Sequence, residues 1–513
     1  MQEKRIIDVP SNVVPMTPKQ GDGAPLEALK QLGLTPEQIA LVMSCLMTNA
    51  GHGSQEMTKP YIIQKKDGGC YIDKDLLREY IIHQYDLKFY NNFKILQNGY
   101  YKDIDLKELI INDMPTSKRS AKITDEVMVE LRYDNRLKIN ERDLANYGDP
   151  RYIPFSNGIY DINTKSLLNY EENKHLIFVN QIPRAYNPDA ERCEVFEKFM
   201  YNLCRDDFEL RRLLLQIIGV AISDIRGFKK MFWFYNDKAD SGKSTFLNVL
   251  QVLLTSPAGE KSYSGVSLSQ LVSAESFDTH HIIGKKVNID SDVDTSFVIK
   301  SDGQLKKLSG GTEEISFSIK NKEAISTKIN ALLLFACNGV PKMWLNTKQA
   351  LASRFMLIRF ANVVAKEDQI KNLENKINYE YVIKLALEEL HSFIDDNYTF
   401  IEPKVVTLAR KEMIEESDDV IKFISHVISY DETSGKDYST SAIYHRFKYW
   451  FEIIEGNDTR PPAPKTFTAR MKETFGEKIY GMRGPKEKRV RSFCNLKLNE
   501  EFEREFNDKQ IPF

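Results

Sequence analysis

The chain has 513 residues, of which 42% are hydrophobic and 28% charged, and its formal net charge is -2. This composition is typical of a globular protein and excludes a protein-wide positive charge, so any contact with nucleic acid must be local. No run approaches the ~18 apolar residues of a membrane span, and the six cysteines form no CxxC pair that would indicate zinc or a disulfide framework. The opening residues, MQEKRIIDVP, lack an apolar signal segment, so we expect a cytoplasmic protein without a membrane partner.

The first part of the chain alternates short strand-like runs with helices. Residues 1–24 are polar and rich in proline, which predicts a flexible arm, and helical spacing of apolar residues predicts a helical hairpin over 25–47. The dipeptide Asn98-Gly99 predicts a β-hairpin. Asp103 and Asp105 would hold metal ions in a polymerase or primase. They open a predicted helix, however, where acidic residues stabilise the helix dipole, and this structural interpretation is favoured.

The middle of the chain contains predicted strands and helices that precede a strand–loop–helix segment. Residues 153–190 are rich in strand formers, and a long amphipathic helical stretch is predicted over 195–222. Met231 to Tyr235 are five consecutive apolar or aromatic residues, too few for a helix, and they predict a buried parallel strand. A polar loop and a predicted helix follow this strand.

The loop after this strand ends in a GKST tetrapeptide. Backbone N–H groups at the start of the following helix would face an anion, a lysine would reach the outer phosphates and a hydroxyl would ligate Mg²⁺. Lys243 and Ser244 have these last two roles in the prediction, and the cofactor-binding residues are Ser241, Gly242, Lys243, Ser244 and Thr245. The predicted ligands of this loop are therefore nucleotide phosphates and Mg²⁺.

The predicted phosphate loop is poor in glycine. Asp237 stands where the full motif has a glycine, and Ala239 and Asp240 stand where glycines could have eased the turn. Acidic side chains near a triphosphate repel it unless they point away or bind Mg²⁺ through water. Because GKST also occurs by chance, a helix start that binds nothing remains the alternative.

Three further strands are predicted downstream, over 285–290, 331–337 and 355–360. They indicate an α/β fold with a parallel sheet whose ligands lie at the carboxyl ends of the strands. Asp290 and Asp292 supply carboxylates for Mg²⁺, Asn338 can hold a water molecule, and Arg354 can stabilise a transferring phosphoryl group. The alternatives are a solvated loop, a turn residue and a surface arginine, respectively.

The order of these parts is similar to that of a known family. GKST, KKVNIDSD, LSGGTEEISFSIKNKEAIS, LLLFACNGVP and ALASRFMLIRF resemble, in this order, the superfamily-three helicases, which are AAA+ ATPases of phages, plasmids, mobile islands and large DNA viruses. The preceding FSNGIYDINTKSLLNY, NQIPRAYNPDA and FELRRLLLQIIGVAIS resemble the N-terminal region of the phage and poxvirus branch, the primase-helicases. The resemblance spans roughly Tyr85 to Phe360.

The resemblance implies roles for individual residues. Asp290 and Asp292 would be the Walker B acids that hold Mg²⁺, and Asn338 would be sensor 1. Arg354 would be an arginine finger donated to the neighbouring subunit of a hexameric ring. Lys320 and Lys322 would lie at the tip of a pore hairpin over 310–327 that grips single-stranded DNA, whereas without the family the tip would be a solvated turn.

The C-terminal part carries a local concentration of positive charge. Helices are predicted over 420–428, over 439–456 and from Pro464, followed by a basic hairpin around Gly484-Pro485. This order resembles the winged-helix DNA-binding modules attached to many of these helicases, and a solvated charge run is the alternative. The candidate DNA-binding residues there are Arg470, Lys486, Lys488 and Arg489.

The sequence thus predicts an AAA+ parallel-sheet core, an α+β N-terminal domain and a winged-helix-like C-terminal domain. The expected segments are an arm (1–24), the N-terminal domain (25–194), the helicase core (195–365), a helical lid and linker (366–416) and the winged-helix-like domain (417–513). The implied function is a replicative DNA helicase of a phage or mobile element, a homo-hexamer that uses ATP to move 3′ to 5′ on single-stranded or forked DNA.

The implied partners of this helicase are replication-origin DNA and a primase or loader protein. Two rivals remain. One is a ring-forming origin-binding initiator with structural, non-hydrolysed nucleotide, and the other is a primase that uses Asp103 and Asp105.

Overall fold

The computed structural model describes residues 59–236, 241–273, 277–294, 297–299, 303–311, 313–319, 322–339, 342–343, 351–364, 369–433, 435–457, 460–484 and 489–509. The predicted arm, the helical hairpin over 25–47, Asp237, Asp240, Lys320, Lys486 and Lys488 lie outside these residues. The chain divides into two compact units: residues up to Tyr147 with Asn173–Asn180, and Gly148–Glu172 with the residues from Gln181 on. The five expected segments are finer than these units, and their boundaries stay a prediction.

From Lys59 on, where its description begins, the first unit combines short antiparallel strands with three α-helices. The sheets are β1 with β2, and β3 with β4 and β5. Asn98 and Gly99 join β4 to β5, which confirms the predicted hairpin. The Asp105 carboxylate accepts the Glu108 N–H at the start of α4, so this acid caps a helix as expected. The elements are β1 (Ile62–Gln64), β2 (Cys70–Ile72), α3 (Lys74–Tyr85), β3 (Lys88–Tyr90), β4 (Asn92–Gln97), β5 (Tyr100–Asp103), α4 (Leu106–Asp113) and α5 (Ala121–Tyr133).

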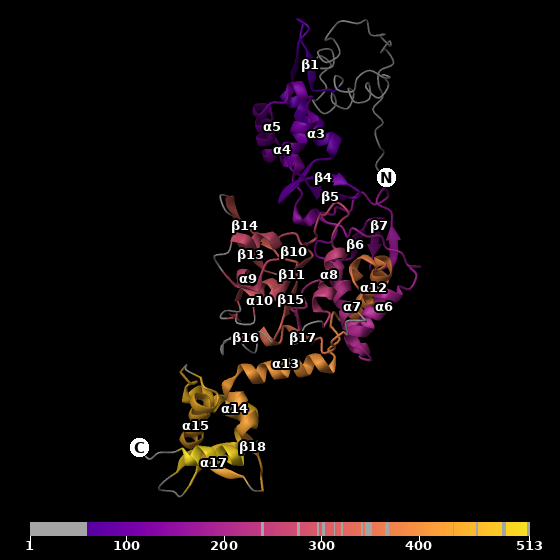
Figure 1. The fold of residues 1–513 in the computed structure, drawn as a ribbon. Coiled ribbons are helices and arrows are strands. Elements are labelled where there is room, and N and C mark those ends of the chain that lie inside the picture. The colour runs from indigo at the N-terminus through magenta and orange to yellow at the C-terminus, as the bar shows by residue number, and fades with distance from the viewer. Residues whose placement is uncertain are drawn as a thin grey trace, which may run out of the picture. The chain divides into compact units, whose positions relative to one another are not determined.

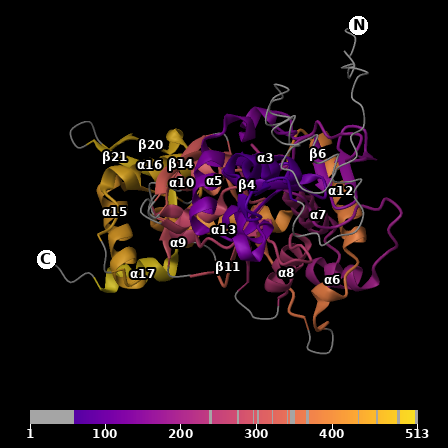
Figure 2. The same ribbon diagram turned by 90° about the horizontal axis from the view of Figure 1, so that it is seen from above.

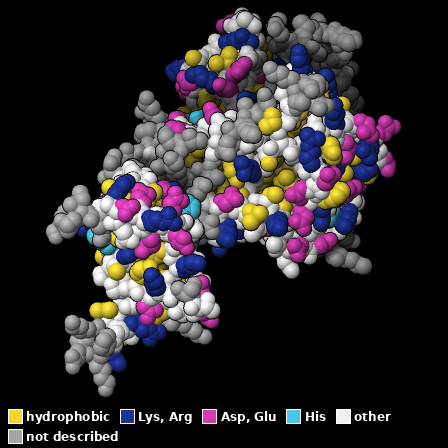
Figure 3. Space-filling view, turned by 60° about the horizontal axis from the view of Figure 1, so that its bottom comes forward, with side chains coloured by type: hydrophobic (Ala, Val, Ile, Leu, Met, Phe, Trp, Pro, Cys, Tyr) yellow, Lys and Arg dark blue, Asp and Glu magenta, His cyan; other side chains and the backbone are white. Residues whose placement is uncertain are grey.

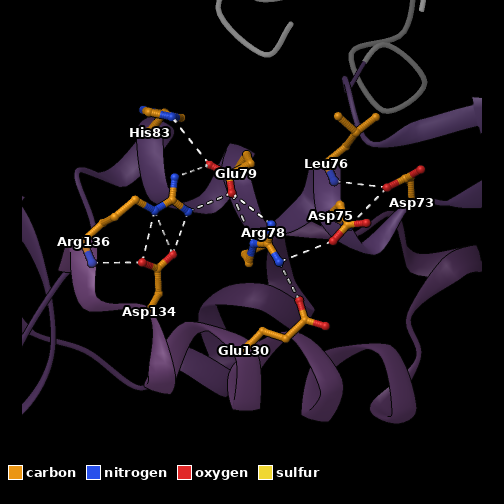
Figure 4. Close-up of polar contacts among 9 residues, drawn as sticks. All are labelled: Asp73, Asp75, Leu76, Arg78, Glu79, His83, Glu130, Asp134 and Arg136. Carbon is orange, nitrogen blue, oxygen red and sulfur yellow. Dashed lines mark hydrogen bonds and ion pairs between the residues drawn. The ribbon is translucent and has the colours of Figure 1, made fainter. Parts of the chain in front are cut away.

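A buried ion-pair network ties α3 to α5 in this unit (Figure 4). Glu79 of α3 is 2% exposed and accepts a hydrogen bond from Arg136 at 2.9 Å. Arg78 contacts the same carboxylate and also donates to Glu130 of α5 at 2.9 Å. Burial alone would raise the pKa of Glu79, but the hydrogen bonds and charges of Arg136 and Arg78 hold that pKa below its ordinary value.

The second unit contains a parallel sheet of five described strands in the order β10-β11-β15-β9-β17. These strands are β9 (Met231–Tyr235), β10 (Tyr263–Ser264), β11 (Val287–Val293), β15 (Leu332–Cys337) and β17 (Phe355–Arg359). All four pairings are parallel, as the sequence predicts, and β10 is a strand that the sequence pattern does not reveal. β11 extends beyond the predicted strand and includes both Asp290 and Asp292, with a register shift against β15 between Asp290 and Val293.

The sheet separates two hydrophobic cores. Side chains alternate across β9, so Phe232 and Phe234 pack into one core while Met231, Trp233 and Tyr235 pack into the other. The first core contains α7 (Phe208–Ile222), α8 (Lys243–Leu253) and α12 (Tyr379–Asp395), and α7 and α12 lie side by side in Figures 1 and 2. The second core contains α9 (Leu268–Val272) and α10 (Gly303–Gly310).

The predicted helical stretch over 195–222 is two helices. α6 (Glu194–Cys204) ends where Arg205 adopts φ +51°, and the Asp207 side chain accepts the Leu210 N–H at the start of α7. Apolar spacing continues across the break, which is why the sequence pattern does not show it. A three-stranded antiparallel sheet precedes α6 and consists of β6 (Tyr152–Phe155), β7 (Gly158–Asp161) and β8 (Ser166–Leu168).

The segment of the chain between β11 and β15 contains a β-hairpin, as predicted. β13 (Glu314–Ile319) pairs antiparallel with β14 (Lys322–Lys328), and Ile315 and Phe317 are buried in the second core. Two short strands, β12 (Val298–Ile299) and β16 (Lys342–Met343), pair in parallel. α13 (Lys404–Ser417) follows α12.

The last part of the chain has its own core, to which helices and strands both contribute. Three predicted helices and the basic hairpin are present, and the Ser439 side chain accepts the Ala442 N–H at the start of the second helix. β20 pairs antiparallel with β21, and β21 also pairs with β18 and β19. The elements are α14 (Asp419–Val427), β18 (Ile428–Tyr430), β19 (Lys436–Ser439), α15 (Thr440–Tyr449) with a π-helical end (Trp450–Ile454), α16 (Pro464–Phe475), β20 (Tyr480–Arg483), β21 (Val490–Leu498) and α17 (Glu500–Asp508).

Among the described residues, none of the helices combines the length and the apolar character needed to span a bilayer.

Candidate nucleotide site

The GKST segment lies between the carboxyl end of β9 and the first turn of α8. Gly242 adopts φ +86°, a left-handed conformation that favours glycine, and α8 begins at Lys243. A Cβ atom at Gly242 would come within 2.4 Å of Leu203 Cδ2 on α6. Ser241 is buried, Ser244 is exposed and Thr245 is half-buried. The loop thus presents the start of an 11-residue helix, with its unpaired N–H groups, next to α6.

The Lys243 ammonium joins the ends of two neighbouring strands. Its Nζ atom donates to the carbonyl oxygen of Asn236 after β9, to that of Cys337 at the end of β15, and to Asn338 Oδ1, each at 3.0 Å. Lys243 is only 9% exposed. An ammonium has three N–H donors, so acceptors from two neighbouring strand ends can hold it in place. The geometry therefore holds one buried positive charge at the carboxyl edge of the sheet.

A carboxylate lies at the same edge. Asp290 on β11 is half-buried, and its Oδ2 accepts the Leu268 N–H at the start of α9 at 2.7 Å. Burial raises the pKa of Asp290 above its usual range, partly offset by this hydrogen bond. Asp292 is exposed, and its N–H approaches Asp290 Oδ1 at 3.5 Å.

Cys337 lies near both charges, because its carbonyl oxygen accepts from Lys243 and it follows by two residues Phe335, the partner of Asp290 across β11 and β15. Burial raises the pKa of Cys337 to about 11, while the nearby positive charge of Lys243 lowers it and the negative charge of Asp290 raises it. The structure thus brings Lys243, Asn338 and Asp290 to one edge of the sheet, around the end of β15.

Arg354 lies at the other edge. It precedes β17, which runs parallel to β9, so a five-residue strand of about 16 Å separates Arg354 from the carboxyl edge. Its guanidinium donates to the Lys306 carbonyl at 2.6 Å and to Ser309 Oγ at 2.8 Å, in the last turn of α10. Arg354 therefore does not belong to the phosphate site of its own chain and here stabilises a helix C-terminus.

The candidate DNA-binding residues have different surroundings. Lys322 begins β14 next to the hairpin tip, and Arg489 is exposed just before β21. Arg470 on α16 pairs with the buried Asp418 at 3.1 Å and with Glu473 at 2.6 Å, and its side chain is 20% exposed. This geometry gives Arg470 a structural role between α14 and α16, and its contact with DNA stays a prediction.

Two buried asparagines near the site are not identified by the sequence patterns. The Asn288 amide on β11 accepts from Ser264 Oγ and the Val266 N–H and donates to the Val266 carbonyl, which fastens the segment around β10 beside β11. Asn236 is 3% exposed, and its Nδ2 has no hydrogen-bond partner among the described residues. A single amide within or directly after an apolar strand could have revealed both residues. Such an amide is expected to be buried, and a buried amide needs a hydrogen-bond partner.

Comparison with known proteins adds two matches to family models. Residues 89–204 match a family described as D5 N terminal like, and residues 234–354 match a family of unknown function, DUF5906. The second match begins in β9 and ends at Arg354, so it covers the whole candidate nucleotide site.

Solved structures of the NrS-1 C-terminal region are also similar to this chain. The A-form apo structure has 12% sequence identity and a TM-score of 0.45, and it covers 81% of this chain and 98% of that chain. A second A-form apo structure has 12% identity and a TM-score of 0.47, with 82% and 98% covered. None of the curated proteins matches the sequence.

Proposed function

We propose that this chain is an ATP-dependent DNA helicase of the primase-helicase type, acting in the replication of a phage or mobile element. The observation that carries the proposal is the position of Lys243, on the first turn of a helix and bonded to the ends of β9 and β15. A buried lysine at a helix N-terminus, beside a carboxylate and an amide, is the arrangement that phosphoryl transfer uses. The D5 N-terminal-like match over residues 89–204 supports the family.

The residues at the edge of the sheet fit ATP and Mg²⁺. The left-handed Gly242 starts α8 with its first N–H groups unpaired within the helix, where a phosphate can accept them, and Asn236 Nδ2, which has no partner among the described residues, offers a further donor. The Ser244 hydroxyl and the Asp290 carboxylate are oxygen ligands of the kind Mg²⁺ prefers, with Asp292 close by. Bound Mg²⁺ neutralises charge on the phosphates. Lys243 exchanges protein oxygens for phosphate oxygens, and Asn338 then becomes free to orient a water molecule.

The remaining parts complete a motor in the proposal. The parallel strand order, with β15 between the phosphate-loop strand and the strand of Asp290, supports an AAA+ core of superfamily three. Because Arg354 lies at the far edge, it acts on the ATP of a neighbouring subunit in a homo-hexamer. The hairpin with Lys320 and Lys322 contacts single-stranded DNA, and three helices with a basic hairpin support a winged-helix-like module with Arg489.

The test is DNA-stimulated ATP hydrolysis, with strand displacement on a forked duplex measured in parallel. Wild type is expected to hydrolyse ATP and unwind DNA, and Lys243→Ala is expected to lose at least ~100-fold in hydrolysis, because an electrostatic contact to the transferring phosphate disappears. Lys404→Ala, which removes an exposed lysine at the start of α13, is the matched control and keeps both activities. A wild type that hydrolyses ATP at the rate of Lys243→Ala would contradict the proposal.

One observation favours a second candidate, the ring-forming origin-binding initiator with structural nucleotide. Three protein oxygens of the described residues accept from the Lys243 ammonium, so ATP must displace them before the lysine can reach a phosphate. If wild type binds ATP and DNA but neither hydrolyses nor unwinds, this function replaces the helicase. The primase alternative has less support, because Asp105 caps α4 and Asp103 pairs with Lys94.

A further inference from the structure

A hollow adjoins the candidate phosphate site on the side of α6. Its volume is about 190 Å³, and its walls include Gly242 and Thr245 from the phosphate loop and α8. The other walls come from α6 and from the segment after β17: Phe199, Asn202, Ile370 and Leu373. A nucleotide whose phosphates bind at the start of α8 has its base within a few bonds of this hollow. Val364, Gln369 and Lys371 also line the hollow, so its walls combine apolar residues with polar and charged ones. Pockets for small ligands combine the two kinds of group.

Asn202 is the polar group that points to a ligand. It is 8% exposed and lines the hollow, and its side chain makes no hydrogen bond within the described part of the chain. The Asn202 amide is not among the fully buried, unpartnered groups of the described residues, so it opens into the hollow, where a ligand can bond it in place of water. A carboxamide can pair in a bidentate way with the N6 and N7 atoms of adenine, because it presents one donor and one acceptor side by side.

Phe199 supplies the apolar side of the same hollow. Its ring is one turn before Asn202 on α6, and its Cε2 atom lies 4.0 Å from the Cβ position built at Gly242. Aromatic rings bind nucleic-acid bases by stacking on their faces. α6 is held against the loop by Leu203, which contacts Gly242 and whose carbonyl oxygen accepts from Asn362 at 3.0 Å.

We propose that this hollow is the adenine-binding slot of the chain, in which Phe199 stacks on the base and Asn202 reads its edge. The proposal rests on the proposed function, since it places the base of the same ATP whose phosphates bind Lys243. It makes α6 part of the nucleotide site and gives the chain a preference for ATP over inosine triphosphate, which lacks the N6 amino group.

The test is equilibrium binding by the full chain, measured by calorimetry with three probes: ATP, inosine triphosphate and inorganic tripolyphosphate. Phe199→Leu retains an apolar side chain in the core but removes the ring. It is expected to weaken the binding of ATP about tenfold or more and to leave the affinity for tripolyphosphate unchanged. Asn202→Leu is expected to abolish the preference for ATP over inosine triphosphate. Tyr201→Ala on the same helix is the control, because Tyr201 is 51% exposed and does not line the hollow.

The outcomes distinguish a failure of the adenine slot from a failure of the proposed ATPase function. If wild type binds ATP and both variants bind it equally well with unchanged selectivity, the slot is wrong and the ATPase proposal stands. Equal wild-type affinity for ATP and tripolyphosphate would also overturn the slot. If wild type binds none of the three probes, the proposed function fails and the slot fails with it.

Discussion

At the scale of single residues, the phosphate loop depends on one glycine. Gly242 adopts φ +86° and contacts Leu203 of α6 so closely that a Cβ atom would lie 2.4 Å from the leucine side chain. Two separate penalties thus act on any other residue there: backbone strain and overlap with α6. Only the second can be relieved by shortening Leu203, so the two penalties can be measured separately.

Gly242→Ala is expected to lower the free energy of unfolding by about 2–6 kcal/mol and to weaken ATP binding, since strain costs about 1–3 kcal/mol and overpacking about as much. The double variant Gly242→Ala/Leu203→Ala is expected to recover part of the ATP binding. Thermal unfolding and ATP titration of the single and double variants are the measurements. An alanine variant with wild-type stability and affinity would show that the loop rearranges freely.

At the scale of elements, α3 and α5 are joined by charges rather than by apolar contacts alone. Glu79 is 2% exposed and is shared by Arg78 and Arg136, and Asp134 also pairs with Arg136 at 2.6 Å (Figure 4). Hydrogen bonds from Arg136 likewise lower the pKa of Asp134. Because both carboxyl groups have a lower pKa when folded than when unfolded, they stabilise the unit above their unfolded pKa values, about 4. That contribution is lost as pH falls through the folded values.

Protection of the α3 amides in hydrogen–deuterium exchange, corrected for intrinsic exchange, is therefore expected to fall steeply below about pH 4. Arg136→Gln is expected to cost about 3 kcal/mol at pH 7, since a buried carboxylate loses one of its two arginine partners. The same variant should show a shallower loss of protection in acid. Lys74→Gln is the control, because its pair with Glu126 is exposed at both ends and contributes little. Equal acid sensitivity in all three proteins would contradict the network's role.

At the scale of the whole molecule, the proposed ATPase is incomplete in one chain. Arg354 and Lys243 lie at opposite edges of one parallel sheet, so a site that contains both requires two subunits. The chain has no protein-wide positive charge that would attract DNA to its whole surface. The face in Figure 3 shows basic and acidic side chains interspersed over its described surface, in keeping with the net charge of -2. In the proposed function, contacts with DNA are therefore local.

Mixing inactive subunits tests this arrangement. Lys243→Ala and Arg354→Ala are each expected to be inactive as ATPases, whereas an equal mixture is expected to regain about a quarter of wild-type hydrolysis, because one interface in four is intact when subunits associate at random. Steady-state hydrolysis after joint refolding or exchange is the measurement. If Arg354 only stabilises the end of α10, the mixture stays as inactive as its components, and Arg354→Ala unfolds at a lower temperature.

Local patterns in the sequence determined much of the fold. β9 follows from five consecutive apolar residues, the turns at Asn98-Gly99 and the cap at Ser439 follow from short-range chemistry, and the alternation of strands and helices predicts the parallel sheet. Each of these signals acts within a few residues, so no tertiary information is needed. The sequence pattern did not reveal the break between α6 and α7, because the apolar spacing continues across Arg205.

Tertiary structure alone decided what surrounds the site. No sequence spacing relates Lys243 to Cys337, Asn338 to the same ammonium, or Leu203 to Gly242, since these contacts form only when the strand order brings distant segments together. The same holds for Arg470, which a count of positive charges assigns to DNA but which the fold pairs with buried Asp418. The sequence by itself determined which chemical groups are available and on which elements they lie. The packing of those elements decided which groups meet, because burial and hydrogen bonding depend on neighbours far away in the chain.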